Sequence, residues 1–181
     1  FSELGLLAEG YGFGAIWTAN HIGARDPFMC FMPLAGASTG IRMGPVAVSP
    51  FELHPVKMAN QLLTLNEASA GRANIIVGGG GGSLIAMGLK SGRRVMHPQM
   101  LKGVRECIEI LRLAGSGELL NYKGDVFEIT GYQPGWSRDT APQIYLGASK
   151  PKMLALAATF ADGVMLSDVT LARMPETMAV L

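Results

Sequence analysis

The chain has 181 residues, of which 49% are hydrophobic and 16% are charged, and its formal net charge is +1. That composition predicts a folded chain with a sizeable core and excludes an intrinsically disordered one. The sequence shows no basic stripe and no run of about 20 apolar residues, so we expect neither a nucleic acid nor a membrane as a partner.

Short apolar runs alternate with helical patterns along the whole chain. The runs predict strands at residues 13–19, 41–48, 74–77, 143–146 and 164–166. Helical spacing and Pro at helix starts predict helices at residues 2–11 and 27–38, from Pro55, at 84–89, from Pro98, from Pro151, and at 170–181. This alternation predicts right-handed βαβ units and one parallel sheet, in a single domain that covers residues 1–181.

Residues 41–82 form the clearest strand–helix–strand unit of the sequence. Both strands lack a polar alternation, which is typical of parallel strands that are buried on both faces. The first strand ends in Val46 and Ala47, and the second runs into five glycines. Because ligands bind at the C-terminal ends of parallel strands, this unit predicts a binding site where its two strands end.

The glycine run begins with Gly78, Gly79 and Gly80 and leaves several backbone N–H groups free of a neighbouring Cβ. No Lys followed by Ser or Thr comes after it, so it is not a Walker phosphate loop. A plain glycine run also fits any dinucleotide-binding spacing, so it identifies no nucleotide. The run predicts either a close backbone approach to a ligand or a flexible turn.

A second loop, made of Gly147, Ala148, Ser149 and Lys150, comes just before the helix that begins at Pro151. Free N–H groups and the positive end of the helix dipole favour an anion there, and Ser and Lys add donors. The other interpretation is an ordinary loop in which Ser149 or Lys150 caps the helix.

Residues 121–140 differ in character from the rest of the chain. A turn at residues 122–125 and a short strand at 126–129 predict a hairpin or lid outside the main sheet.

Cys30 and Cys107 are interpreted as reduced thiols, which favours a cytoplasmic protein. His54 and His97 each precede a proline and are interpreted as helix-entry residues. Together with His21 they show no metal-ligand spacing, so no metal is predicted.

Four blocks in this order, WTANH, IRMGPVAVSP, HPVKMANQLLTLNEASAGRANIIVGGG and IYLGASKPKMLALAATFADGVM, resemble the luciferase-like flavin-dependent oxidoreductases. Within that family the chain looks most like the deazaflavin branch, which uses coenzyme F420, with the methylenetetrahydromethanopterin reductases nearest. The resemblance implies a (β/α)8 TIM barrel, present here incompletely as about strands two to six. We therefore expect either a fragment of a longer polypeptide or a truncated relative that closes by association.

The resemblance also implies a site. Asn20 and His21 match a position near the cofactor ring, where His21 would act as the catalytic residue by polarising the ring or carrying a proton. Val46 and Ala47 match a cis non-proline peptide that forms a bulge behind the ring. The two glycine loops would hold the cofactor, although the acidic or polar side chain that the family carries in the first loop is absent here.

These implications lead to an oxidoreductase that moves a hydride between coenzyme F420 and a small organic substrate, with a homodimer as the expected assembly. One alternative is an FMN-dependent monooxygenase of the same fold. A second is a truncated, non-catalytic flavoprotein fragment. A third is a Rossmann-type nucleotide-binding domain, which would place residues 78–82 where the order of strands in the sheet reverses.

Overall fold

The computed structural model describes residues 1–88, 92–137 and 140–181. For residues 92–98 it describes the backbone alone. Within these residues, no helix combines the length and the apolar character needed to cross a membrane.

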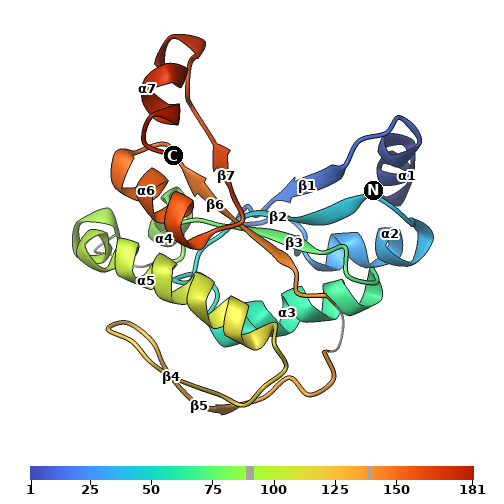
Figure 1. Cartoon of the computed structure of the whole chain (residues 1–181), viewed down its shortest axis with the longest axis horizontal. Coiled ribbons are helices and arrows are strands. Elements are labelled where there is room, and N and C mark those ends of the chain that lie inside the picture. The colour runs from blue at the N-terminus through green and yellow to red at the C-terminus, as the bar shows by residue number, and fades with distance from the viewer. Residues whose placement is uncertain (89–91, 138–139) are drawn as a thin grey trace.

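The core of the fold is a curled sheet of parallel strands (Figure 1). Its strands lie side by side in chain order, as β1 (Ala15–Ala19), β2 (Arg42–Val48), β3 (Asn74–Val77), β6 (Gln143–Ala148) and β7 (Gly163–Leu166). Because this order never reverses, the sheet is not of the Rossmann type, and that alternative is wrong. A curled parallel sheet with sequential strands is the partial (β/α)8 barrel that the sequence predicted.

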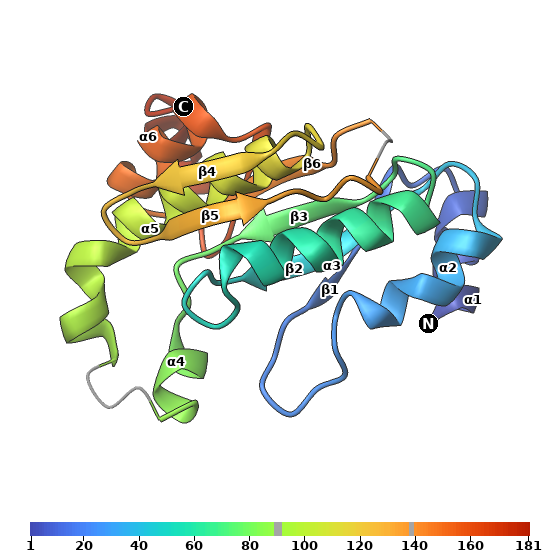
Figure 2. The same ribbon diagram turned by 90° about the horizontal axis from the view of Figure 1, so that it is seen from below.

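The helices are α1 (Ser2–Gly10), α2 (Met32–Ala37), α3 (Pro55–Ala68), α4 (Gly82–Ala86), α5 (Gly92–Ala114), α6 (Pro151–Phe160) and α7 (Met174–Met178), with short 3-10 turns at Met29–Phe31 and Leu171–Arg173. Helices α2, α3, α5 and α6 lie along the convex side of this sheet, whereas α7 lies beyond β7 and α4 beyond the end of β3 (Figures 1 and 2). Helix α5 begins six residues before Pro98, where the sequence predicted its start. Proline removes one helical hydrogen bond without preventing a turn before it. His97 therefore lies inside α5 rather than at its entry, and its side chain is outside the described residues.

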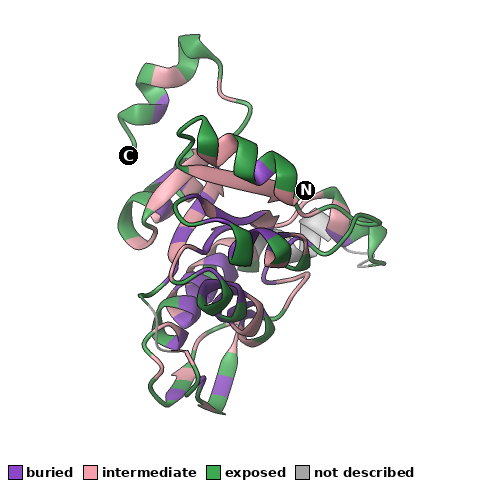
Figure 3. Cartoon of the chain, turned by 90° about the vertical axis from the view of Figure 1, so that its right-hand side faces the viewer, coloured by how far each residue is buried: buried purple, intermediate pink, exposed green. Residues whose placement is uncertain are grey.

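The main core fills the space between the sheet and these helices. Met43, Ile75, Ile144 and Leu146 are fully or almost fully buried there, and Val104, Cys107, Ile108 and Leu111 of α5 face them as one apolar stripe. Alternate strand residues point to the opposite, concave face, where Trp17 and Tyr145 pack edge to face with ring centroids 5.5 Å apart. Figure 3 shows that the convex side holds most of the buried residues.

Strands β4 (Leu120–Lys123) and β5 (Glu128–Tyr132) pair as an antiparallel hairpin, so the predicted excursion is a hairpin. Figure 2 shows it on the outer side of α3 and α5, which separate it from the sheet. The fully buried carboxylate of Glu106 on α5 accepts backbone N–H groups from residues 125–127 at the hairpin turn, with the shortest distances to each between 2.8 and 3.0 Å. This carboxylate therefore fixes the turn to α5.

A second carboxylate joins the N-terminal helix to the sheet. Glu9 on α1 accepts backbone N–H groups from Thr39 at 3.0 Å, from Gly40, and from Ile41 at 2.9 Å, just before β2. These hydrogen bonds, chiefly from Gly40 and Ile41, hold the pKa of Glu9 below its ordinary value because they stabilise the ionised form.

Candidate functional site

The C-terminal ends of β1, β2, β3 and β6 meet at one edge of the sheet. The backbone N–H of Asn20 donates to Val46 O at 2.8 Å, and that of Gly78 donates to Val48 O at 2.9 Å. Strand β6 pairs with β3 through Val77 and Leu146, just before its own end. The parallel register thus brings together the segments that the sequence singled out, at residues 20–21, 46–47, 78–80 and 147–150.

Small residues from three of these strands meet at Ala47. A Cβ built on Gly78 would lie 3.0 Å from the Ala47 Cβ, and one built on Gly147 would lie 3.8 Å from it. The peptide between Val46 and Ala47 is cis, as the resemblance implied. Ala47, Gly78 and Gly147 thus place only small residues where β2, β3 and β6 end, and we call this group the glycine cradle.

The loop after β6 borders this cradle. Lys150 occupies the N-cap position of α6, and no side chain makes a capping hydrogen bond there. Ser149 is half-buried and Lys150 is exposed. Lys150 is therefore the N-cap residue, as the ordinary-loop interpretation had it, but its side chain and that of Ser149 make no capping bond and remain available to a ligand.

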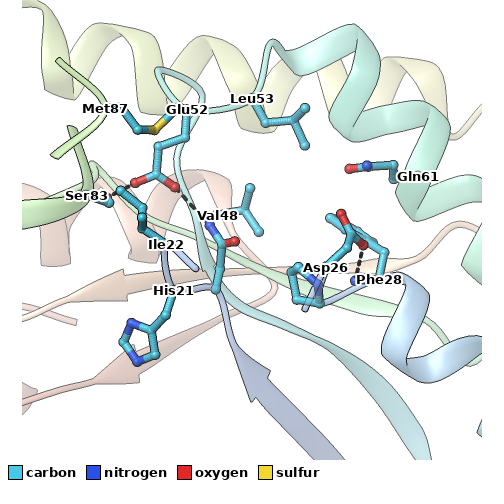
Figure 4. Close-up of a pocket in the computed structure, with 12 residues that line it drawn as sticks. His21, Ile22, Asp26, Phe28, Val48, Glu52, Leu53, Gln61, Ser83 and Met87 are labelled. Atoms are coloured by element: carbon cyan, nitrogen blue, oxygen red, sulfur yellow. Dashed lines mark hydrogen bonds between the residues drawn. The ribbon is translucent and has the colours of Figure 1, made fainter. Parts of the chain in front are cut away.

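A pocket of about 200 Å³ opens beside the cradle (Figure 4). It is lined mainly by the loops after β1 and β2 and by α4, including Asn20, His21, Glu52, Gln61 and Ser83. Glu52 is central to its polar side. Its carboxylate accepts a hydrogen bond from Asn20 Nδ2 at 2.8 Å and another from Ser83 Oγ.

Asn20 joins this polar group to the cradle. Its Nδ2 also donates to the carbonyl oxygen of Ala47 at 3.4 Å. The side chain of Asn20 therefore contacts both the small-residue surface and the pocket, which places it at the boundary between them.

His21 lies at the same edge with a different environment. Its side chain is exposed, and Figure 4 shows the imidazole turned away from Glu52. Within the described residues, neither imidazole nitrogen takes part in a hydrogen bond. Both nitrogens are thus accessible to a ligand that enters the mouth of the sheet.

His54 has a structural role instead. Its Nδ1 accepts the backbone N–H of Val56 at 3.3 Å and so caps α3, as the sequence predicted.

Both cysteines are free thiols; Cys107 is fully buried, and burial raises its pKa, whereas Cys30 is half-buried. Across the described part of the chain, no group of three or more His, Cys, Asp or Glu residues is arranged to hold a metal ion.

The sequence reasoning missed Glu52 and Ser83. Glu52 lies four residues past the end of β2, and a single acidic residue in a loop is ordinarily a solvated surface group. The available signal was indirect: the first glycine loop lacks a side-chain acid, and a neighbouring strand-end loop carries one.

The comparisons with known proteins identify the family of this chain. A family model described as luciferase-like monooxygenase matches residues 1–181. A 5,10-methylenetetrahydromethanopterin reductase from Archaeoglobus fulgidus is 34% identical over 161 residues, which are 89% of this chain and 47% of that protein. An F420-dependent glucose-6-phosphate dehydrogenase from Amycolatopsis mediterranei is 25% identical over 89% of this chain and 51% of its own length.

Among solved structures, the coenzyme F420-dependent tetrahydromethanopterin reductase from Methanopyrus kandleri superposes with a TM-score of 0.80 at 24% identity. The match covers 92% of this chain and 51% of that one. The chain thus spans about half the length of the relatives it matches, and the structural likeness supports the barrel fold.

Proposed function

The chain belongs to the luciferase-like monooxygenase family, and we propose that it forms the cofactor-binding part of an F420-dependent oxidoreductase. In this proposal a hydride moves between coenzyme F420, a deazaflavin, and a small organic substrate. The names of two relatives, an F420-dependent sugar-phosphate dehydrogenase and an F420-dependent pterin reductase, support the choice of cofactor.

The glycine cradle is the observation that carries this proposal. A flat ring can lie against backbone only where side chains are absent or very small, and Ala47, Gly78 and Gly147 supply such residues from three adjacent strands. A Cβ at Gly147 would meet Ile76 Cγ2 at 3.4 Å, which is ordinary contact, so packing within the protein does not require glycine there. Gly147 is therefore a position where an added methyl group tests the ligand surface with little disturbance of the protein's own packing.

Each neighbouring residue has a distinct part in this proposal. When bound, the deazaflavin would supply or accept the hydride. The exposed imidazole of His21 would polarise the ring or hold a proton at one of its nitrogens. The backbone N–H groups of Gly79, Gly80 and residues 147–150, with the Ser149 hydroxyl and the Lys150 ammonium, would hold the polar and phosphorylated tail.

Binding measurements on the Gly147→Ala variant test the proposal. Titration of the purified chain with F420, followed by deazaflavin fluorescence, is expected to give saturable binding. The added methyl group should weaken binding about tenfold or more, because it fills the cradle while its own protein contacts remain acceptable. Gly10→Ala is the matched control, because a Cβ at Gly10 meets nothing within 4 Å.

The outcomes are separable. Equal F420 binding by the chain and by Gly147→Ala would show that the cradle does not hold the ring. Binding of FMN in place of F420, weakened by the same substitution, would favour the FMN-dependent monooxygenase. A folded chain that retains neither cofactor would support the non-catalytic fragment.

We also propose a cytoplasmic homodimer. Two free cysteines suit a reducing compartment, and α1 exposes Leu4 and Leu7 by more than half of their surface. Light scattering coupled to size-exclusion chromatography tests the dimer; a monomeric mass at micromolar concentration would contradict it.

A further inference from the structure

The loop between β2 and α3 places one carboxylate where three strand-end loops meet. Glu52 in this loop is half-buried and lines the pocket beside the cradle. Its two hydrogen-bond donors come from other loops: Asn20 follows β1, and Ser83 lies in the first turn of α4, after β3. Figure 4 shows Glu52 projecting between these loops, with Ser83 next to its carboxylate.

The carboxylate determines how the Asn20 amide is oriented. An ionised carboxylate only accepts hydrogen bonds, so the amide must turn its nitrogen toward Glu52. The two N–H groups of Nδ2 are then directed at Glu52 and at the carbonyl oxygen of Ala47. Within the described residues, Asn20 Oδ1 accepts no hydrogen bond, which leaves it as an acceptor for a ligand N–H.

The same carboxylate anchors the glycine loop at its far end. Five consecutive residues, Gly78–Gly82, have no side chain with which to hold a conformation. The loop is fixed at its start by the hydrogen bond from Gly78 N to Val48 O. Ser83 is the first residue after the glycines with a side-chain donor, and that donor binds Glu52. Packing restrains the first part of the loop, because a Cβ on Gly79 or Gly80 would collide with Met100 or Leu84. A Cβ on Gly81 or Gly82 would meet nothing within 4 Å, so the last part of the loop has no such restraint.

We propose that Glu52 is a positioning residue that orders the glycine loop through Ser83 and orients the Asn20 amide for a ligand at the cradle. The effect on ligand affinity rests on the proposed function, whereas the ordering of the loop does not. The glycine run has no side chains that could restrain its conformation. The Glu52 carboxylate, which lies in a neighbouring loop, thus provides that restraint by binding Ser83.

Hydrogen–deuterium exchange of the ligand-free chain tests the loop. The amides of Met87 and Gly88 report on α4, because they donate to Ser83 O at 2.9 Å and Ile85 O at 3.1 Å. In Glu52→Gln their exchange should be about tenfold faster, as expected from the loss of a hydrogen bond to a charged group. Ser83→Ala should give the same result with a smaller change in the protein, and Glu67→Gln, an exposed change on α3, should give none.

F420 titrations test the amide. The titrations use Ser83→Ala as the background, in which the contact of Glu52 with the glycine loop is already lost. In that background Glu52→Gln and Asn20→Ala should each weaken F420 binding about tenfold, and the two together should bind like Asn20→Ala, because the remaining route of Glu52 is through Asn20. Losses that multiply in the double variant would overturn this route, as would exchange in Glu52→Gln and Ser83→Ala no faster than in Glu67→Gln. If the unmodified chain binds no F420 while Glu52→Gln still speeds exchange, the proposed function fails and the ordering of the loop by Glu52 is supported.

Discussion

Two glutamates, Glu52 and Glu106, each accept hydrogen bonds through a side-chain carboxylate, but in different surroundings. Each carboxylate receives hydrogen bonds from residues that are distant in the sequence. Glu106 is fully buried under the hairpin and binds three backbone N–H groups. Glu52 is half-buried at the mouth of the sheet and binds two side chains.

The difference separates a structural carboxylate from one suited to a binding site. The three backbone donors of the hairpin turn bind a carboxylate that is itself fully buried, so losing it leaves them without that partner and leaves a cavity beneath the turn. Side-chain donors at a pocket can rotate toward water or a ligand. Glu106 should therefore contribute mainly to stability, and Glu52 mainly to the arrangement of the strand-end loops.

The Glu106→Ala substitution should have the largest effect on stability. It removes three hydrogen bonds to a charged acceptor and opens a cavity, so we expect the free energy of unfolding to fall by about 3 kcal/mol or more. Urea denaturation followed by circular dichroism measures this change. Glu106→Gln keeps one acceptor oxygen and should lose clearly less; a loss below about 1 kcal/mol in Glu106→Ala would contradict the structural role.

The Glu52→Ala substitution should cost much less, about 1 kcal/mol, because Asn20 and Ser83 can bind water once the carboxylate is gone. The same urea measurement applies. A loss equal to that of Glu106→Ala would remove the distinction between the two carboxylates, and Glu67→Gln serves as the surface reference.

Glu9 provides a third carboxylate and the smallest expected effect, which is measured by how stability changes as the pH falls into the acidic range. Its pKa is below the ordinary value in the folded chain, so the folded state binds fewer protons than the unfolded one. Its contribution is therefore fully present above the ordinary pKa of 4.5 and is lost as the pH falls through the lower, folded value. Melting temperatures across this acidic range should fall less steeply in Glu9→Gln than in the parent chain; parallel profiles would refute the assignment.

Much of the fold could be predicted from the sequence, because its signals are local. Apolar runs and Pro entries identified all the strands of the parallel sheet and located β3 and the start of α3 correctly. The start of α5 was predicted wrongly because Pro98 was interpreted as a helix entry, and a proline can also follow a turn of helix. The register of parallel strands then made it predictable that residues 20–21, 46–47, 78–80 and 147–150 would meet.

The tertiary structure alone decided which side chains act on these segments. Glu52 is 32 residues from Asn20 and 31 from Ser83, and Glu106 is about 20 residues from the hairpin turn that it binds. The periodicity of apolar residues in the sequence does not predict these hydrogen bonds, because bonds between loops depend on how strands and helices are placed in space. The sequence by itself determined the order of strands and helices and the family; the packing of helices against a curled sheet determined the partners of each carboxylate.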